Sequence, residues 1–422
     1  QAGSLYGERI AHAPWLRSNR WLAARISAGN AAQVPELLLA MSDLARKGLL
    51  AETTTLPATT LQNWRKRYGI HQPLSQFFDH CARQLRAQQQ HQPSSTYQWL
   101  TQLPADNDYS TLARVLGVYP LAGIPFRMGV VREQQALAAD WGKIPAQQGQ
   151  IGMAYSPLAA QNNPPQDQLR QHAPVWWVAG NTAANLPGTP YWQGDQLRTD
   201  TRKPVSFAFT SRARWQQQDL LQLNYVLWFS ERPALQPLDW VAGQHDAVVF
   251  RVNLNASGKV IAYDSIHLCG CWYRLFLPED MPYTPAPPNH WQEPVLMQRI
   301  DATGGRMVIY LSKDTHQIIF MHPASEDRLT NNFMSQYKTE RKTYQLRPFQ
   351  DLMRLRAGNA IRPVFDQQGY VPGSERPERW LFWPMGVKNP GALRRFGDHA
   401  TNFIGRRFFD EADLLEKLGV QP

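Results

Sequence analysis

The sequence lacks most of the features that would assign it directly to a class of protein. Only three of its 422 residues are cysteines, which is too few for a disulfide framework and leaves one thiol unpaired in a monomer. No apolar run reaches the roughly 20 residues that span a bilayer, because residues 115–131 are interrupted by Pro120, Pro125 and Arg127. We therefore expect no transmembrane segment, and a free or lipid-tethered chain rather than an integral one.

Clustered charge is also missing. The net charge is +10, which favours anionic partners, but Lys and Arg are scattered without a run of five, so there is no clear nucleic-acid signature. The composition, 43% hydrophobic with 18% charged residues, is that of a folded globular protein. The partners we expect are an anionic envelope component, a glycan or another protein, and the oligomeric state is not predicted.

The first part of the chain, residues 1–144, has helical periodicity. Asn30 can cap one helix, and Thr60 can cap a second that stops before Gly69. A third places Cys81 in an apolar stripe, where it serves as a small buried hydrophobe. Residues 110–131, broken by prolines, predict two short packed helices.

The rest of the chain predicts an α+β protein. Residues 145–174, rich in Gln, Pro, Ala and Asn, are expected to form a polar linker. Residues 175–345 alternate apolar and polar side chains, as strands do, and predict an antiparallel β domain. Residues 346–422 predict C-terminal helices packed on this central antiparallel sheet, one starting at Asn389 and the last capped by Asp410. The expected strands are 175–178, 205–209, 221–229, 247–254, 259–267, 306–311 and 317–322.

The stretch from Tyr263 to Trp272 holds two of the three cysteines beside a histidine. In a strand, alternate side chains face the same way, so His267, Cys269 and Cys271 would project to one side. A glycine inside a strand pattern often marks a bend. Gly270 would then swing the two sulfurs together.

One interpretation of this stretch is a metal site. Thiolates and imidazoles bind zinc, so His267, Cys269 and Cys271 are candidate ligands for zinc or another transition metal, with His322 or His399 completing the shell. A position left to water would allow that water to be activated for hydrolysis. Weaker candidate ligands are Asp264, His245 and His290.

Three other interpretations stay open. Cys269 and Cys271 could form a redox pair, whose disulfide would be strained and easily reduced. One of them could be a nucleophile, with His267, His322 or His399 as its base. The third is two buried thiols packed in an aromatic sheet.

The chain contains seven short stretches, 14–17, 20–23, 223–225, 228–229, 264–271, 383–386 and 399–401. In this order they resemble a family of uncharacterised proteobacterial exported proteins, often made with lipoprotein leaders. In that family a histidine often follows the second cysteine by two residues, whereas this chain has Tyr273 there. The resemblance implies a periplasmic or outer-membrane-tethered location, and a start at Gln1 fits a removed leader; a cytoplasmic location stays open.

Function follows from these features only as alternatives, and whether the protein is an enzyme is not decided. The first is a metal-dependent hydrolase of the cell envelope, with catalytic residues unknown. The second is a non-enzymatic envelope binding or assembly lipoprotein. The third is a thiol redox protein using Cys269 and Cys271.

Overall fold

The structure is a computed structural model of the chain. It describes residues 6–11, 13–90, 92–103, 109–140, 151–158, 167–285, 292–302, 306–324 and 340–421. Helices and strands both contribute substantially, so the α+β class is confirmed. No helix in these ranges is long and apolar enough to cross a membrane.

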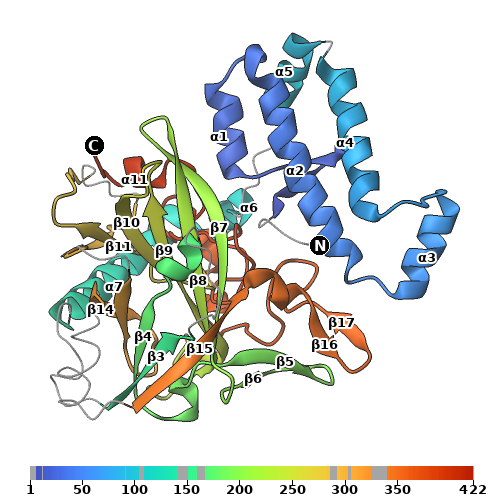
Figure 1. The fold of residues 1–422 in the computed structure, drawn as a ribbon. Helices are drawn as coiled ribbons and strands as arrows, with labels where there is room; N and C mark the ends of the chain where they lie inside the picture. The colour runs from blue at the N-terminus through green and yellow to red at the C-terminus, as the bar shows by residue number, and fades with distance from the viewer. Residues whose placement is uncertain are drawn as a thin grey trace.

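The N-terminal residues form a helical unit set to one side of the main sheet (Figure 1). Its core includes Leu16, Trp21 and Met41, which are buried together with other apolar residues of the unit. Asn30 caps the turn leading into the longest helix of this unit, as the sequence predicts. The elements are β1 (Glu8–Ile10), β2 (Ala13–Ser18), α1 (Arg20–Ala28), α2 (Val34–Thr53), α3 (Ala58–Arg67), α4 (Leu74–Gln90) and α5 (Pro93–Thr101).

Two further helices, α6 (Thr111–Leu116) and α7 (Tyr119–Asp140), follow this unit. Two helices were expected over 110–131, but the expectation that both are short is wrong, because α7 has 22 residues and continues through Pro125. Gln134 of α7 donates a hydrogen bond to the carbonyl of Pro294, 2.8 Å away. This contact sets α7 beside the segment that leads into β12 (Leu296–Ile300).

The main sheet has eleven strands in the order β12-β11-β10-β9-β8-β7-β15-β3-β4-β13-β14. Its longest members are antiparallel neighbours, and the β9–β10 hairpin turns at 255–258 as expected. The remaining bounds are β3 (Gly152–Pro157), β4 (Val175–Ala179), β7 (Val205–Trp215), β8 (Gln218–Arg232), β9 (Gly243–Leu254), β10 (Val260–His267), β11 (Arg274–Pro278), β13 (Met307–Leu311), β14 (Ile318–Pro323) and β15 (Glu340–Pro348).

The expectation of a purely antiparallel sheet is wrong, because the sheet is mixed. β15 pairs in parallel with both β3 and β7, and β4 with β13 and β11 with β12 are also parallel. β3 lies within the segment expected to be a linker, of which residues 145–150 and 159–166 are outside the described ranges. Strand β3 therefore belongs to the sheet rather than to a connection between domains.

The two ends of the sheet curve toward each other. Arg274 on β11 donates hydrogen bonds to the carbonyl of Ile318 and to the side chain of Gln317, at the far end of the strand order. A guanidinium bound in this way holds the β13–β14 hairpin near β11. Two small hairpins, β5 (Thr189–Gln193) with β6 (Gln196–Asp200) and β16 (Leu355–Ala357) with β17 (Ala360–Arg362), flank the sheet.

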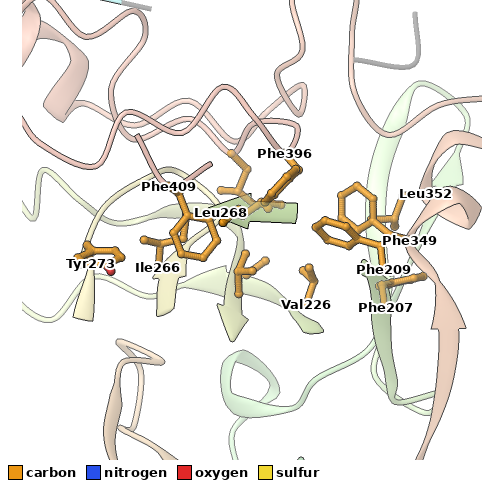
Figure 2. Packing of buried hydrophobic residues seen from close by; sticks show 14 of the residues in the cluster. Phe207, Phe209, Val226, Ile266, Leu268, Tyr273, Phe349, Leu352, Phe396 and Phe409 are labelled. Atoms are coloured by element: carbon orange, nitrogen blue, oxygen red, sulfur yellow. The ribbon is translucent and has the colours of Figure 1, made fainter. Parts of the chain in front are cut away.

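The C-terminal segment covers the sheet as an irregular chain, contrary to the expected helix from Asn389. Gly391, Gly397 and Gly405 have positive φ angles of 84°, 101° and 85°, and such residues interrupt a helix. Figure 2 shows Phe396 and Phe409 of this segment close to Ile266 of β10 and Leu268 of the turn that follows this strand. Its short helices are α10 (Glu378–Phe382), the 3₁₀ helix η7 (Trp383–Met385) and α11 (Leu414–Lys417).

Candidate functional site

The candidate site begins at a tight turn after β10. The strand ends at His267, whose backbone N–H donates to the carbonyl of Cys271 at 2.9 Å, while Gly270 N–H donates to the carbonyl of His267 at 2.8 Å. Gly270 has φ of 92°, in the left-handed region that favours glycine. The bend expected at Gly270 is confirmed, so the three side chains no longer alternate along a strand.

Close packing is a second reason why position 270 requires glycine. A Cβ atom at this position would lie 2.6 Å from the carbonyl oxygen of Ala400, which is closer than van der Waals contact allows. The turn therefore fits against the C-terminal segment only with glycine at this position.

The turn brings the two thiols into hydrogen-bond contact. The bond from Cys271, with help from the nearby Arg376 guanidinium, lowers the pKa of Cys269. The same bond, together with burial, raises the pKa of Cys271 well above its usual value. Both cysteines are free thiols, and Cys269 is the better thiolate of the pair because the neighbouring thiol donates to it.

His267 is held by a buried carboxylate. Its Nδ1 lies 3.2 Å from Oδ1 of Asp246 on β9. Burial lowers the pKa of His267, so the neutral ring donates through Nδ1 and keeps a lone pair on Nε2. In the part of the chain that the structure describes, this buried Nε2 has no hydrogen-bond partner.

Asp246 also forms hydrogen bonds with two further side chains. His316 Nδ1 lies 2.8 Å from Asp246 Oδ2, and Arg376 donates to Oδ1 at 3.3 Å. Burial opposes the charge of this carboxylate, but the attraction of His267, the bonds from both histidines and Arg376 hold its pKa well below the usual value. A buried anion compensated in this way ties together β9, β10, the β13–β14 hairpin and the loop before α10.

His316 is a histidine that the sequence interpretation did not single out. Its Nε2 lies 3.1 Å from the carbonyl of Ala184, so both ring nitrogens face oxygen acceptors. The ring stacks on Phe229 with centroids 3.8 Å apart. Nothing in its surroundings, 314–317, resembles a motif, so its role as a partner of Asp246 could be found only from the fold.

The two histidines expected to complete a metal shell form hydrogen bonds with other groups instead. His399 Nε2 donates to the carbonyl of Leu268 at 3.1 Å, and burial lowers its pKa to about 3. His322, on β14, accepts from the Tyr310 hydroxyl at 3.1 Å and donates to the carbonyl of Pro323. His399 thus packs against the turn as a neutral ring, and His322 belongs to the far edge of the sheet.

The weaker ligand candidates are also occupied or remote. Asp264 is buried and ion-paired with Arg251. Burial lowers the pKa of His245 to about 4, and its ring packs near Trp228. Cys81, expected to be a small buried hydrophobe rather than a ligand, is half-buried on α4 within the helical unit. His290 lies outside the described residues.

Across the described ranges, no three or more His, Cys, Asp and Glu side chains are grouped so that they could hold a metal ion. The structure brings Cys269 and Cys271 together and places His267 and His399 beside the same turn. It does not bring His322 to them. The geometry therefore favours a thiol pair over a site with three or more ligands.

Cys271 lines a cavity of about 610 Å³ between α7, the turn, β11 and α10. Most of its wall is apolar, and one side of α7 supplies Ala122, Phe126 and Val130. The volume is in the range of small-molecule sites. Further apolar side chains come from the C-terminal segment: Leu381, Phe382, Met385 and Phe403.

Two acidic residues face this apolar space. Burial raises the pKa of Glu378, partly opposed by Arg376 and Arg232, and burial likewise raises the pKa of Glu293. Glu293 accepts hydrogen bonds from the backbone N–H groups of Phe403 and Ile404, at 2.5 and 3.0 Å. The sequence interpretation missed both acids, because neither belongs to a motif and each lies more than 20 residues from the cysteines.

A second, larger cleft of about 1060 Å³ separates α1 and α2 from β7 and the C-terminal segment. Its lining is more charged and includes Arg20, Glu36, Asp43 and Lys47. We regard the smaller cavity as the candidate site because buried groups with shifted pKa values converge on it, as they do at functional sites.

Comparison with known proteins gives little further guidance. No family model matches the chain, and no curated protein matches it. A solved structure described as NLPPya in complex with mannosamine is similar at 15% identity, over 50% of this chain and 90% of that one, with a TM-score of 0.24. A similarity at this level supports no conclusion about fold or function.

Proposed function

We propose that the protein is a binding protein that takes an amphiphilic small molecule into the cavity beside Cys271. The observation that carries this proposal is the apolar cavity of about 610 Å³ with Glu378 and Glu293 in its wall. Sites of this kind hold a ligand by apolar burial and orient it with a few polar groups. The envelope location implied by the family resemblance remains part of the proposal.

The wall chemistry defines the ligand class. The apolar side chains of α7 and α10 suit a hydrocarbon or aromatic body. Glu378 and Glu293 are hydrogen-bond acceptors when ionised, so the polar end of the ligand should be a donor, such as a hydroxyl or an ammonium group. Arg407, which also lines the cavity, is bonded to Thr401 at 3.1 Å.

Filling the cavity tests this proposal. Gly129 lines it from α7, and a Cβ there meets nothing within 4 Å. Gly129→Phe should therefore fold normally yet reduce binding of the fluorescent amine N-phenyl-1-naphthylamine by about tenfold or more. Gly129→Ala is the matched control and should bind as the parent does. Equal binding by the Phe variant and the parent would contradict the proposal.

A second candidate function is thiol–disulfide exchange by Cys269 and Cys271. The hydrogen bond between the thiols favours it, because the lowered pKa of Cys269 raises its thiolate fraction. Reaction with glutathione disulfide would form one intramolecular S–S bond and release two molecules of glutathione. Cys81→Ser protein exposed to glutathione disulfide should lose the mass of two hydrogen atoms and stop reacting with maleimide. Two thiols that remain free and alkylatable would contradict this candidate.

A further inference from the structure

An unusual number of large apolar side chains is exposed on α6, α7 and the α10–η7 segment. Leu116 and Leu121 are 66% and 68% exposed, and Trp380 is 69% exposed. Monomeric soluble proteins rarely leave large contiguous apolar patches open to water unless the patch binds something. We call these residues the apolar face: Leu112, Val115, Leu116, Val118, Leu121, Ile124, Met128, Trp380, Leu381 and Trp383.

Helix α7 is apolar on two opposite sides. Ala122, Phe126 and Val130 line the cavity, whereas Leu121 and Ile124 are exposed. At about 100° per residue these two sets lie on different sides of the helix. A surface helix of a globular protein normally keeps a polar outer side, so the outer side of α7 has features of an interaction surface.

Aromatic contacts beneath the apolar face hold its segments next to one another. The ring of Phe126 on α7 lies 4.8 Å from Phe382 on α10 and 5.0 Å from Phe403, and the latter two rings are 5.2 Å apart. Arg114 of α6 donates to the carbonyls of Met385 and Gly405. Segments distant in the sequence are therefore fixed side by side.

The segments that carry the apolar face are basic. Residues 111–132, 379–388 and 402–407 contain no Asp or Glu. Arg132, Lys388 and Arg406 are exposed basic residues of these segments. Basic side chains beside an apolar helix, with tryptophans among them, are typical of helices that lie in the interface of an anionic membrane.

We propose that the apolar face docks on an anionic lipid bilayer, with α7 lying in the plane of the headgroups. Trp380 and Trp383 enter the interfacial region, and the flanking basic residues bind lipid phosphates. Charge complementarity favours this partner over a second copy of the chain, because two copies of an acid-free basic surface repel each other. The inference stands apart from the cavity ligand, although the inner side of the same helix lines that cavity.

Vesicle flotation tests the proposal. The full chain should float with vesicles of phosphatidylcholine and phosphatidylglycerol, less with phosphatidylcholine alone, and less at high salt. Leu121→Glu with Ile124→Glu should weaken binding by at least about tenfold. Leu39→Glu, which changes a leucine that is 52% exposed on α2, is the matched control and should leave binding unchanged.

Two results would overturn the proposal. The first is a parent protein that stays in the aqueous fraction with both kinds of vesicle, or binds both equally. The second is a parent dimer, seen by sedimentation velocity, that Leu121→Glu with Ile124→Glu converts to monomer, because the apolar face would then be a self-association surface. Quenching of Trp380 and Trp383 by brominated lipid, reduced in Trp380→Phe with Trp383→Phe, supports direct insertion.

Discussion

Phe126 of α7 meets Phe382 of α10 edge to face, with ring centroids 4.8 Å apart and an interplanar angle of 86°. This pair joins a helix from the first third of the chain to a segment near its end. Both rings line the cavity on their inner side. The contact therefore supports the cavity and the apolar face at once.

Phe126→Ala should loosen α7 from α10. We expect a loss of about 2 kcal/mol in the free energy of unfolding, less than for a fully buried phenylalanine because Phe126 is only half-buried. Affinity for N-phenyl-1-naphthylamine should fall several-fold. Urea unfolding and probe titration measure the two effects. Phe126→Leu, which keeps most of the apolar volume, should show less than half of each, and identical losses in both variants would contradict the role of ring packing.

Gly270→Ala should be more harmful than an alanine at another left-handed glycine. Gly258 has φ of 82° and open space around it, whereas a Cβ on Gly270 would press on Ala400. Gly258→Ala should lose only about 1–2 kcal/mol, the cost of the left-handed conformation, and Gly270→Ala should lose more. Because the turn positions the thiols, Gly270→Ala should also change the rate at which Cys271 reacts with Ellman's reagent. Equal unfolding free energies for the two variants would contradict the packing argument.

Asp246→Asn should strongly destabilise the fold. The change removes the charge that compensates Arg376 and leaves one carboxylate acceptor fewer for His267 and His316, and breaking a buried ion pair commonly costs about 3–5 kcal/mol. Thermal and urea unfolding measure this loss. Asp195→Asn is a suitable control, since Asp195 pairs with Arg362 at the surface, and it should change stability by less than about 1 kcal/mol. A loss of that small size at Asp246 would indicate that the cluster is not buried as described.

His399 predicts a specific dependence of stability on pH. Folding lowers its pKa from 6.5 to about 3, so between these values the unfolded chain binds a proton that the folded protein does not. The contribution of His399 to the free energy of unfolding is therefore fully present above pH 6.5. It falls by up to about 1.4 kcal/mol per pH unit as the pH decreases toward 3. In His399→Gln, which can still donate to Leu268, this part of the slope should vanish. Unfolding in urea across the same range tests it, and an unchanged slope would assign the effect to other groups, such as His245.

Much of the fold could be predicted, because the alternation of apolar and polar side chains indicates which segments form strands. The strands expected around Trp176, Tyr225 and Phe250 are present as β4, β8 and β9. The same pattern does not indicate which strands are neighbours in the sheet, so the parallel strand pairs could not be predicted. The helix expected from Asn389 failed because the glycines that follow adopt left-handed conformations, and its apolar residues reach the core from an irregular chain.

Only the part of the site that is formed by residues close together in the sequence could be predicted. Gly270 between two cysteines correctly indicated a bend that brings the thiols together. Asp246, His316 and Glu378 come from other parts of the sequence, and only tertiary structure places them near His267 and the cysteines. Whether a metal binds at the turn remains a prediction, which metal analysis of protein purified without a histidine tag can test.

Strand β15 determines the order in which the parts of the main sheet can assemble during folding. It lies between β7 on one side and β3 on the other, yet it is made of residues 340–348, after every other strand of the main sheet. During synthesis the β7–β10 hairpins and the β3–β4 pair can each form early, but they cannot be joined into one sheet until this late segment leaves the ribosome. A nascent chain stopped before residue 340 would carry two unpaired strand edges, which makes it a substrate for chaperones.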